Sequence, residues 1–220
     1  MSLLQRLFGL GNAPDSQESL EETRFMVVDV ETTGLDPRRD TLLSIGLVPA
    51  GMHGIELGGM REIMLQHEAD KIDKGNIVVH GITPTESAGG RDTVVALQEF
   101  ITCIGTSWII AFHADFDRMF LTRALKKHLN ARLANPFIDL AWLLPALFPT
   151  SDRALRTLDD WLARFGIEAP YRHRASADAL VTAELLLVAL AEARRQQYCQ
   201  VNALARIAEA QGKLAQMSHG

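Results

Sequence analysis

The stretch of residues 24–35, RFMVVDVETTGL, constrains the fold of this chain more than any other part of its sequence. Its apolar run from Phe25 to Val28 is dense in residues that favour β-structure, which predicts a buried strand. Asp29 and Glu31 follow two positions apart, and that spacing places both carboxylates on one face of a strand. Two such carboxylates are costly to desolvate and repel each other unless a divalent cation binds them. Two solvated acids at a strand end remain the alternative.

Length and composition indicate one α/β core. The chain has 220 residues, of which 47% are hydrophobic and 22% charged, as in ordinary globular proteins. No apolar run is long enough to span a bilayer, and Cys103 and Cys199 lack metal-ligand spacing, so we expect no membrane partner and a cytoplasmic location. The net charge of −5 argues against a broad electrostatic grip on duplex DNA. It still allows an enzyme that holds only a few nucleotides.

Hydrophobic periodicity predicts a sheet of about five strands covered by helices. Strands are expected at residues 25–28, 42–50, 61–66, 108–112 and 137–140, the second and third joined by a hairpin across the glycine-rich residues 51–59. Helices are expected at residues 93–104, 155–165, 175–194 and 198–215, with another directly after the fourth strand.

Two further acids stand where a helix is expected to begin. Asp117 follows the fourth strand in the string FHADFDRMFL. In the string YRHRASADAL, Ser176 is a reasonable N-cap, which places Asp178 in the first helical turn and His173 in the preceding loop. Taken singly, each residue has an ordinary explanation, because an acid can complement the helix dipole and a histidine can lie on the surface.

Together these strings resemble the DEDDh 3′–5′ exonucleases, the family of the proofreading (epsilon) subunit of bacterial DNA polymerase III. The matching strings are VDVETTGLD, VVHGIT, FHADFDRMFL and HRASADALVTAELL, in the family's order. The histidine five residues before the last acid marks the histidine branch of the family. The resemblance implies a ribonuclease H-like fold with a mixed sheet over residues 24–193. Residues 1–23 are then an N-terminal appendage, and residues 194–220 a C-terminal helical extension.

The resemblance also implies a site and a reaction, the hydrolysis of 3′-terminal nucleotides to 5′-monophosphates. Two divalent cations, Mg²⁺ or Mn²⁺, are then held by Asp29, Glu31, Asp117 and Asp178. His173 is implied as the base that takes a proton from water. The residues implied as substrate contacts are Thr32, Thr33, Gly34, Leu35, His80 and Phe116. Where many members carry asparagine, this chain has His113, whose role stays open.

The substrate and the partners are not decided by these motifs. A single-stranded or frayed DNA 3′ end is the expected substrate, and RNA 3′-end trimming is an alternative, because the ribose pocket cannot be read from the motifs. A non-catalytic module beside a DNA polymerase or a sliding clamp is a second alternative, and the string from Gln5 to Phe8 loosely resembles clamp-docking peptides. Arg172 and Arg174 could hold phosphate or be surface residues. The basic residues Arg118, Arg123, Lys126 and Lys127 could form a nucleic-acid track.

Overall fold

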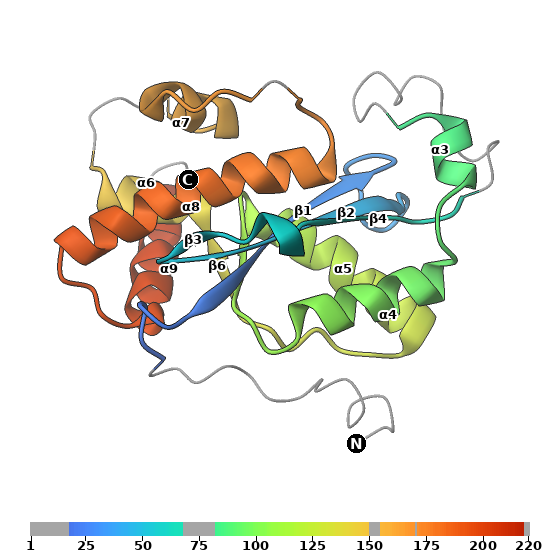
Figure 1. Cartoon of the computed structure of the whole chain (residues 1–220), viewed down its shortest axis with the longest axis horizontal. Helices are drawn as coiled ribbons and strands as arrows, with labels where there is room; N and C mark the ends of the chain where they lie inside the picture. The colour runs from blue at the N-terminus through green and yellow to red at the C-terminus, as the bar shows by residue number, and fades with distance from the viewer. Residues whose placement is uncertain (1–17, 68–81, 150–154, 170, 218–220) are drawn as a thin grey trace.

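The computed structural model describes residues 18–67, 82–149, 155–169 and 171–217 (Figure 1). Its strands are β1 (Arg24–Thr32), β2 (Leu42–Gly51), β3 (Gly54–Ile55), β4 (Arg61–Met64), β5 (Ile109–Ala111) and β6 (Phe137–Asp139). Its helices are α3 (Pro84–Ala88), α4 (Thr93–Ile104), α5 (Ala114–Leu129), α6 (Leu140–Leu147), α7 (Leu158–Phe165), α8 (Ala175–Arg195) and α9 (Val201–Met217), with a 3₁₀ turn η1 (Leu57–Gly59).

β1 lies inside a mixed sheet with the strand order β3-β2-β1-β5-β6, and β4 also pairs with β2. It runs antiparallel to β2 and parallel to β5, which in turn runs parallel to β6. The prediction of a mixed sheet flanked by helices is therefore confirmed. β1 pairs with β2 along its length and with β5 at Met26 and Val27, so β2 holds the backbone of Asp29 and Glu31.

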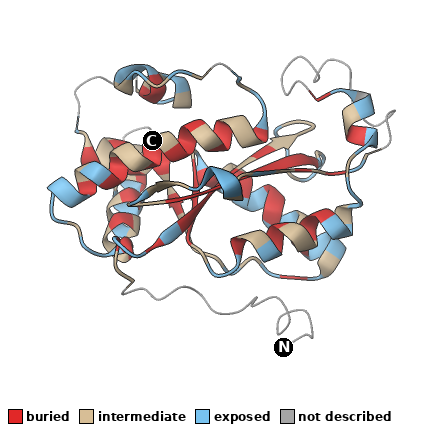
Figure 2. Cartoon of the chain, in the orientation of Figure 1, coloured by how far each residue is buried: buried red, intermediate tan, exposed pale blue. Residues whose placement is uncertain are grey.

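The alternation of side chains along β1 divides the core into two layers (Figures 1 and 2). Phe25 and Val27 face one layer, which α6, α8 and α9 complete. Met26, Val28 and Val30 face the other layer, which contains the buried sides of α4 and α5. These five side chains are almost fully buried, which explains why the strand signal was strong in the sequence.

Gly46 brings the start of α8 against the sheet. It stands opposite Asp29 in the β1–β2 register. A Cβ atom at this position would lie 2.0 Å from the backbone oxygen of Ala175, the first residue of α8, so only glycine fits. This close approach places the first turn of α8 directly beside the acids of β1.

Most expected elements are present, with some differences. The hairpin expected across residues 51–59 contains the short strand β3 and η1, and the third expected strand ends at Met64. Two helices were not predicted. α6 contains Pro145, which hides its helical pattern, and α3 begins at Pro84, a favourable first helical position.

The start of the described chain lies against the segment between α8 and α9. The backbone N–H of Leu20 donates to Cys199 at 2.9 Å, and Ser19 bridges Gln200. α9 packs against α6 and β6. The boundaries at residues 23 and 193 stay predictions. Within the described residues, no helix combines the length and the apolar character needed to cross a bilayer.

Candidate active site

Three of the four candidate metal ligands meet at the end of β1. Ligand oxygens of Asp29, Glu31 and Asp178 lie within 4.8 Å of one another. The first two are held by the strand, and the third comes from the first turn of α8, as the sequence predicted. Their convergence depends on Gly46, because any larger residue would push the start of α8 away from β1.

Electrostatics make this cluster unfavourable without a cation. Burial, followed by repulsion from Asp117, Asp178 and Glu31, raises the pKa of Asp29 well above its usual value. Burial and repulsion from Asp178 and Glu62 raise the pKa of Glu31 to about 8. A divalent cation would relieve both effects, because hard oxygen ligands at this spacing suit Mg²⁺ or Mn²⁺. The donor set therefore fits the metal site that the family resemblance implies.

Asp117 lies beside this triangle rather than within it. It occupies the first turn of α5, and only 3% of its surface is exposed. It is near enough to raise the pKa of Asp29, and its own pKa is raised by burial and, more weakly, by Asp139. The structure thus gathers all four predicted acids at one place, with Asp117 on the side of α5.

Asp139 was missed by the sequence analysis, which assigned it to a strand without a role. It ends β6 and caps α6, where its Oδ1 accepts hydrogen bonds from the backbone N–H groups of His113 at 3.0 Å and Ala141 at 2.9 Å. His113 has a left-handed backbone with φ of 62° at the start of α5. Asp139 therefore fixes the turn that positions Asp117. An aspartate directly before an apolar helix is an N-cap signal that could have revealed it.

His173 lies in the exposed loop immediately before α8. Its φ of 63° is left-handed, and its backbone N–H donates to Oδ2 of Asp178 at 3.1 Å. Arg172 also contacts Asp178, and its Nε lies 3.1 Å from Oδ1 of Asp159 on α7. Burial raises the pKa of Asp178, while Arg172 and His173 lower it in part. The candidate base is thus linked directly to a candidate metal ligand.

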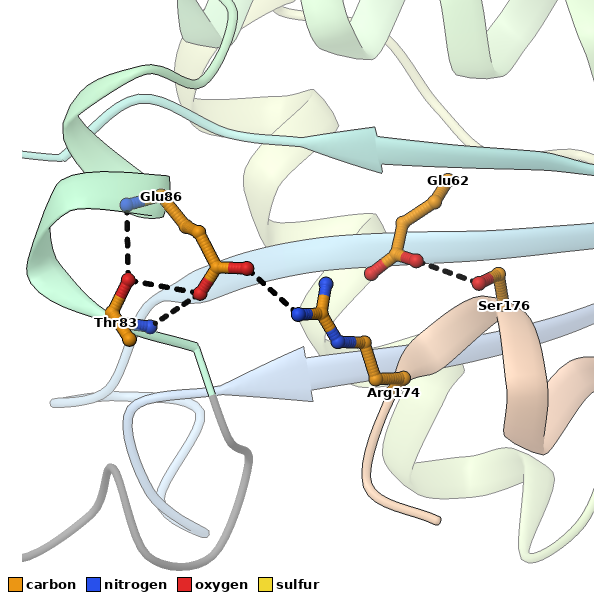
Figure 3. Close-up of polar contacts among 5 residues, drawn as sticks. All are labelled: Glu62, Thr83, Glu86, Arg174 and Ser176. Atoms are coloured by element: carbon orange, nitrogen blue, oxygen red, sulfur yellow. Dashed lines mark hydrogen bonds and ion pairs between the residues drawn. The ribbon is translucent and has the colours of Figure 1, made fainter. Parts of the chain in front are cut away.

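A second set of polar contacts holds the other side of this loop (Figure 3). Arg174 donates from Nη2 to Oε1 of Glu86 at 2.7 Å. The other oxygen of Glu86 accepts from the backbone and hydroxyl of Thr83, closing the capping box of α3. These contacts, those to Thr83 first, lower the pKa of Glu86 to about 2. Both arginines of the loop are therefore in ion pairs with carboxylates.

The expectation that Ser176 caps α8 was wrong. The N-cap lies two residues earlier, at Arg174, whose side chain makes no capping hydrogen bond, and the helix begins at Ala175. Ser176 instead donates its hydroxyl to Oε2 of Glu62 on β4 at 2.6 Å (Figure 3). The serine anchors α8 to the sheet because Glu62, which is distant in sequence, lies within reach.

The described residues predicted to contact substrate lie at the end of β1, in the turn that follows it and in α5. Thr32 donates its hydroxyl to the backbone of Gly34, and Thr33 bonds Asp40 and Thr41. Leu35 stands at the tip with 84% of its surface exposed. Phe116 is partly buried against Phe120, with ring centroids 4.9 Å apart. His80 lies outside the described residues. Substrate contacts by this set stay predictions.

Known proteins resemble this chain in sequence and in fold. A family model described as Exonuclease matches residues 26–186. The DNA polymerase III PolC-type of Bacillus subtilis is 35% identical over 181 residues, which are 79% of this chain and 12% of that protein. The PolC-type polymerase of Thermotoga petrophila is 33% identical over 172 residues, 77% of this chain and again 12% of that protein. The chain thus spans about an eighth of these curated relatives.

A solved structure shares the fold at low sequence identity. Exonuclease I of E. coli in complex with a dT13 oligonucleotide superimposes with a TM-score of 0.69 and 17% identity. The match covers 80% of this chain and 42% of that protein. It is a likeness of fold.

Proposed function

This chain belongs to the exonuclease family whose model matches residues 26–186, and we propose that it removes nucleotides one at a time from the 3′ end of single-stranded or frayed DNA. The observation that carries the proposal is the set of three carboxylates within 4.8 Å, next to a loop that bears a histidine. The three carboxylates meet because Gly46 of β2 lets α8 approach the sheet closely. Acids that merely share a solvated surface would not need such a contact.

Asp29, Glu31 and Asp178 would hold one divalent cation, Mg²⁺ or Mn²⁺, and Asp117 would contribute with Asp29 to a second. Such cations supply Lewis-acid activation of the scissile phosphate and stabilise the leaving 3′ oxygen. The chain's own part is to hold its carboxylates close together before the substrate arrives. The sheet and the turn held by Asp139 keep them there.

His173 would take the proton of the attacking water. Its loop is exposed, so water and the 3′ end can reach it, and its backbone is fixed to Asp178. The turn of residues 32–35 and the ring of Phe116 would seat the terminal nucleotide through its sugar and base face. Such contacts are largely independent of base identity, so little sequence preference is expected.

DNA is the favoured substrate because the relatives are named as DNA polymerases and the fold match contains a bound DNA oligonucleotide. The same relatives support a DNA polymerase as the partner of this chain. We propose a sliding clamp as a further partner, and the residues that motivate it, 5–8, lie outside the described part of the chain. We propose a cytoplasmic location, which the two free cysteines, Cys103 and Cys199, suit.

The test is a paired digestion of matched 3′-labelled single-stranded DNA and RNA with Mg²⁺ or Mn²⁺. The wild type should release 5′-mononucleotides, chelation should stop the release, and Asp29→Asn and His173→Ala should be inactive or nearly so. Asp115→Asn is the matched control, since this exposed acid pairs only with Arg118 among the described residues. If nucleotides are released faster from RNA than from DNA, RNA would replace DNA as the proposed substrate. If nucleotides are released from neither strand, the proposed exonuclease activity is overturned.

A further inference from the structure

A shallow hollow of about 670 Å³ lies between α5 and the turn that follows β1. Its walls carry five basic side chains, those of Arg38, Arg118, Arg123, Lys126 and Lys127. We call it the basic hollow. The rest of its lining is Pro37, Met119 and Thr122, so no acidic residue lines it. In a chain with a net charge of −5, this gathering of positive charge on one surface requires a reason.

Most of these charges are uncompensated. Arg118 pairs with Asp115 at 2.6 Å. Lys126 donates to the amide oxygen of Asn130, a neutral group. Among the residues that the structure describes, Arg38 and Lys127 form no ion pair. All five basic residues are exposed. The hollow is therefore a positive surface open to solvent.

Both walls of the hollow belong to segments that also carry candidate site residues. Arg118 follows Asp117 in α5, and the turn that carries Arg38 follows the strand that carries Glu31. Arg123 donates to the backbone oxygen of Arg38 at 2.6 Å, which ties the two walls together. From Arg118 to Lys127 the helix rises about 14 Å. That length matches about four phosphates of a stacked strand at 3.4 Å each.

We propose that the basic hollow binds the phosphodiester backbone of the substrate strand on the 5′ side of its terminal nucleotide. This rests on the proposed exonuclease function and adds to it a path for the strand. Phosphates suit the row of cations, and Met119 and Leu35, which are 48% and 84% exposed, provide apolar surface for bases. A free phosphate would use the charges but not the apolar side chains.

The experiment measures binding, so it does not depend on catalysis. Fluorescence anisotropy of labelled oligo(dT), from two to ten nucleotides, is recorded with the full chain in EDTA over a range of salt. The test variant is Arg38→Gln with Lys127→Gln. The matched control is Arg206→Gln with Lys213→Gln, which makes the same change of charge at exposed positions on α9.

Wild-type affinity should rise with length to about five nucleotides and then level off. The slope of log affinity against log salt should fall by about 1.4 in the test variant, since each single-strand phosphate contact contributes about 0.7. At 0.1 M salt that corresponds to about a 25-fold weaker affinity for the longer oligonucleotides. The control should keep the wild-type slope, and both variants should bind a dinucleotide equally.

An unchanged slope in the test variant, or an equal loss in the control, would overturn the proposal. The proposal would also be overturned if the test variant kept its affinity for oligonucleotides but lost affinity for poly-glutamate. That result would instead assign the hollow to an acidic protein segment. If no nucleotide is released but the difference in slope is found, the proposed exonuclease activity is wrong, while the proposed binding of the strand to the basic hollow stands. The two proposals are thus distinguishable.

Discussion

The end of β1 and the loop before α8 both contribute to one candidate site, but they are held in different ways. β1 is paired with β2 along its length and with β5 at Met26 and Val27, and its apolar residues are buried in the core. The loop is exposed and carries a left-handed His173. It is held by side-chain contacts of Arg172 and Arg174 to Asp159 and Glu86, on two other helices. The acids of β1 are therefore placed by the backbone, and the candidate base is placed by ion pairs.

This difference determines which part of the site tolerates amino-acid substitution. A sheet register allows no small adjustment, because a shift by one residue turns every side chain to the opposite face. Exposed ion pairs are individually worth about 0.2–1 kcal/mol and can be lost without unfolding. Substitutions at β1 should therefore act as all-or-none changes, and substitutions around the loop should act by degrees.

The largest effect is expected for Asp29→Asn, which should abolish nucleotide release. The same substitution should make the metal-free protein more stable, by a few °C in Tm, because it removes a charge that the neighbouring acids repel. Activity assays and thermal denaturation in EDTA measure the two effects. A loss of activity together with a lower Tm would show instead that the charge of Asp29 supports the fold.

His173→Ala should lower the single-turnover rate by about 10²–10⁴, the usual cost of removing a general base. Binding of divalent cation, followed by calorimetry, should be retained, because the acids of β1 are not disturbed. His53→Ala is the control, since His53 is also exposed and lies in the turn between β2 and β3. A fall of less than tenfold would remove His173 from the chemistry while leaving the acids in place.

The metal-free protein should lose stability as the pH rises from about 5 to 8. The pKa of Glu31 is raised from its ordinary 4.5 to about 8, so the folded state binds a proton more tightly than the unfolded state does. The stabilisation is complete below pH 4.5 and is lost as the pH rises through about 8. Tm measured against pH in EDTA should show this decline. Glu31→Gln should make the decline smaller, and added Mg²⁺ should flatten it.

A pH profile that stays flat in EDTA, or that rises towards pH 8, would contradict the repulsion inferred for the end of β1. The exposed loop provides a contrast within the same molecule. Glu86 has a pKa lowered to about 2, so its contacts should contribute at every pH used here. The pH dependence of stability is therefore expected to report the strand and not the loop.

The same difference explains what the sequence could predict. Asp29 and Glu31 follow four apolar β-formers, and that local pattern was sufficient to place them on one face of a buried strand. The start of α8 at Ala175 was predicted, but its cap was not, because the partner of Ser176 is Glu62 on β4. Contacts between residues far apart in the sequence leave no periodic signal.

Asp139 shows the same limit. Its chemistry was visible as an aspartate before an apolar segment, yet its use depends on His113, which is brought to it by the parallel pairing of β5 and β6. The family resemblance identified the four acids by their order along the chain, and the structure adds what holds them. The parts that could not be predicted are the supports of the site rather than its candidate ligands.

The smallest expected effect concerns the support of the candidate base. Glu86→Gln removes the charge that pairs with Arg174 but keeps the capping box of α3, since glutamine serves at that position. The loss of an ion pair worth up to about 1 kcal/mol corresponds to a fall in rate of about two- to fivefold. This fall should appear in kcat, with KM unchanged, because the loop carries the base and not the seat of the nucleotide.

Glu56→Gln supplies the matched control for that small effect, since the Arg24–Glu56 pair is similarly exposed and spans 2.9 Å at the opposite end of β1. Both variants should lower Tm by a similar small amount, and only Glu86→Gln should lower kcat. Glu86→Arg alone and Arg174→Glu alone should each lower the rate. The double variant that combines them exchanges the two charges and should recover part of the lost rate. Equal effects of the two glutamine variants on kcat would mean that the loop does not need its ion pair to place His173.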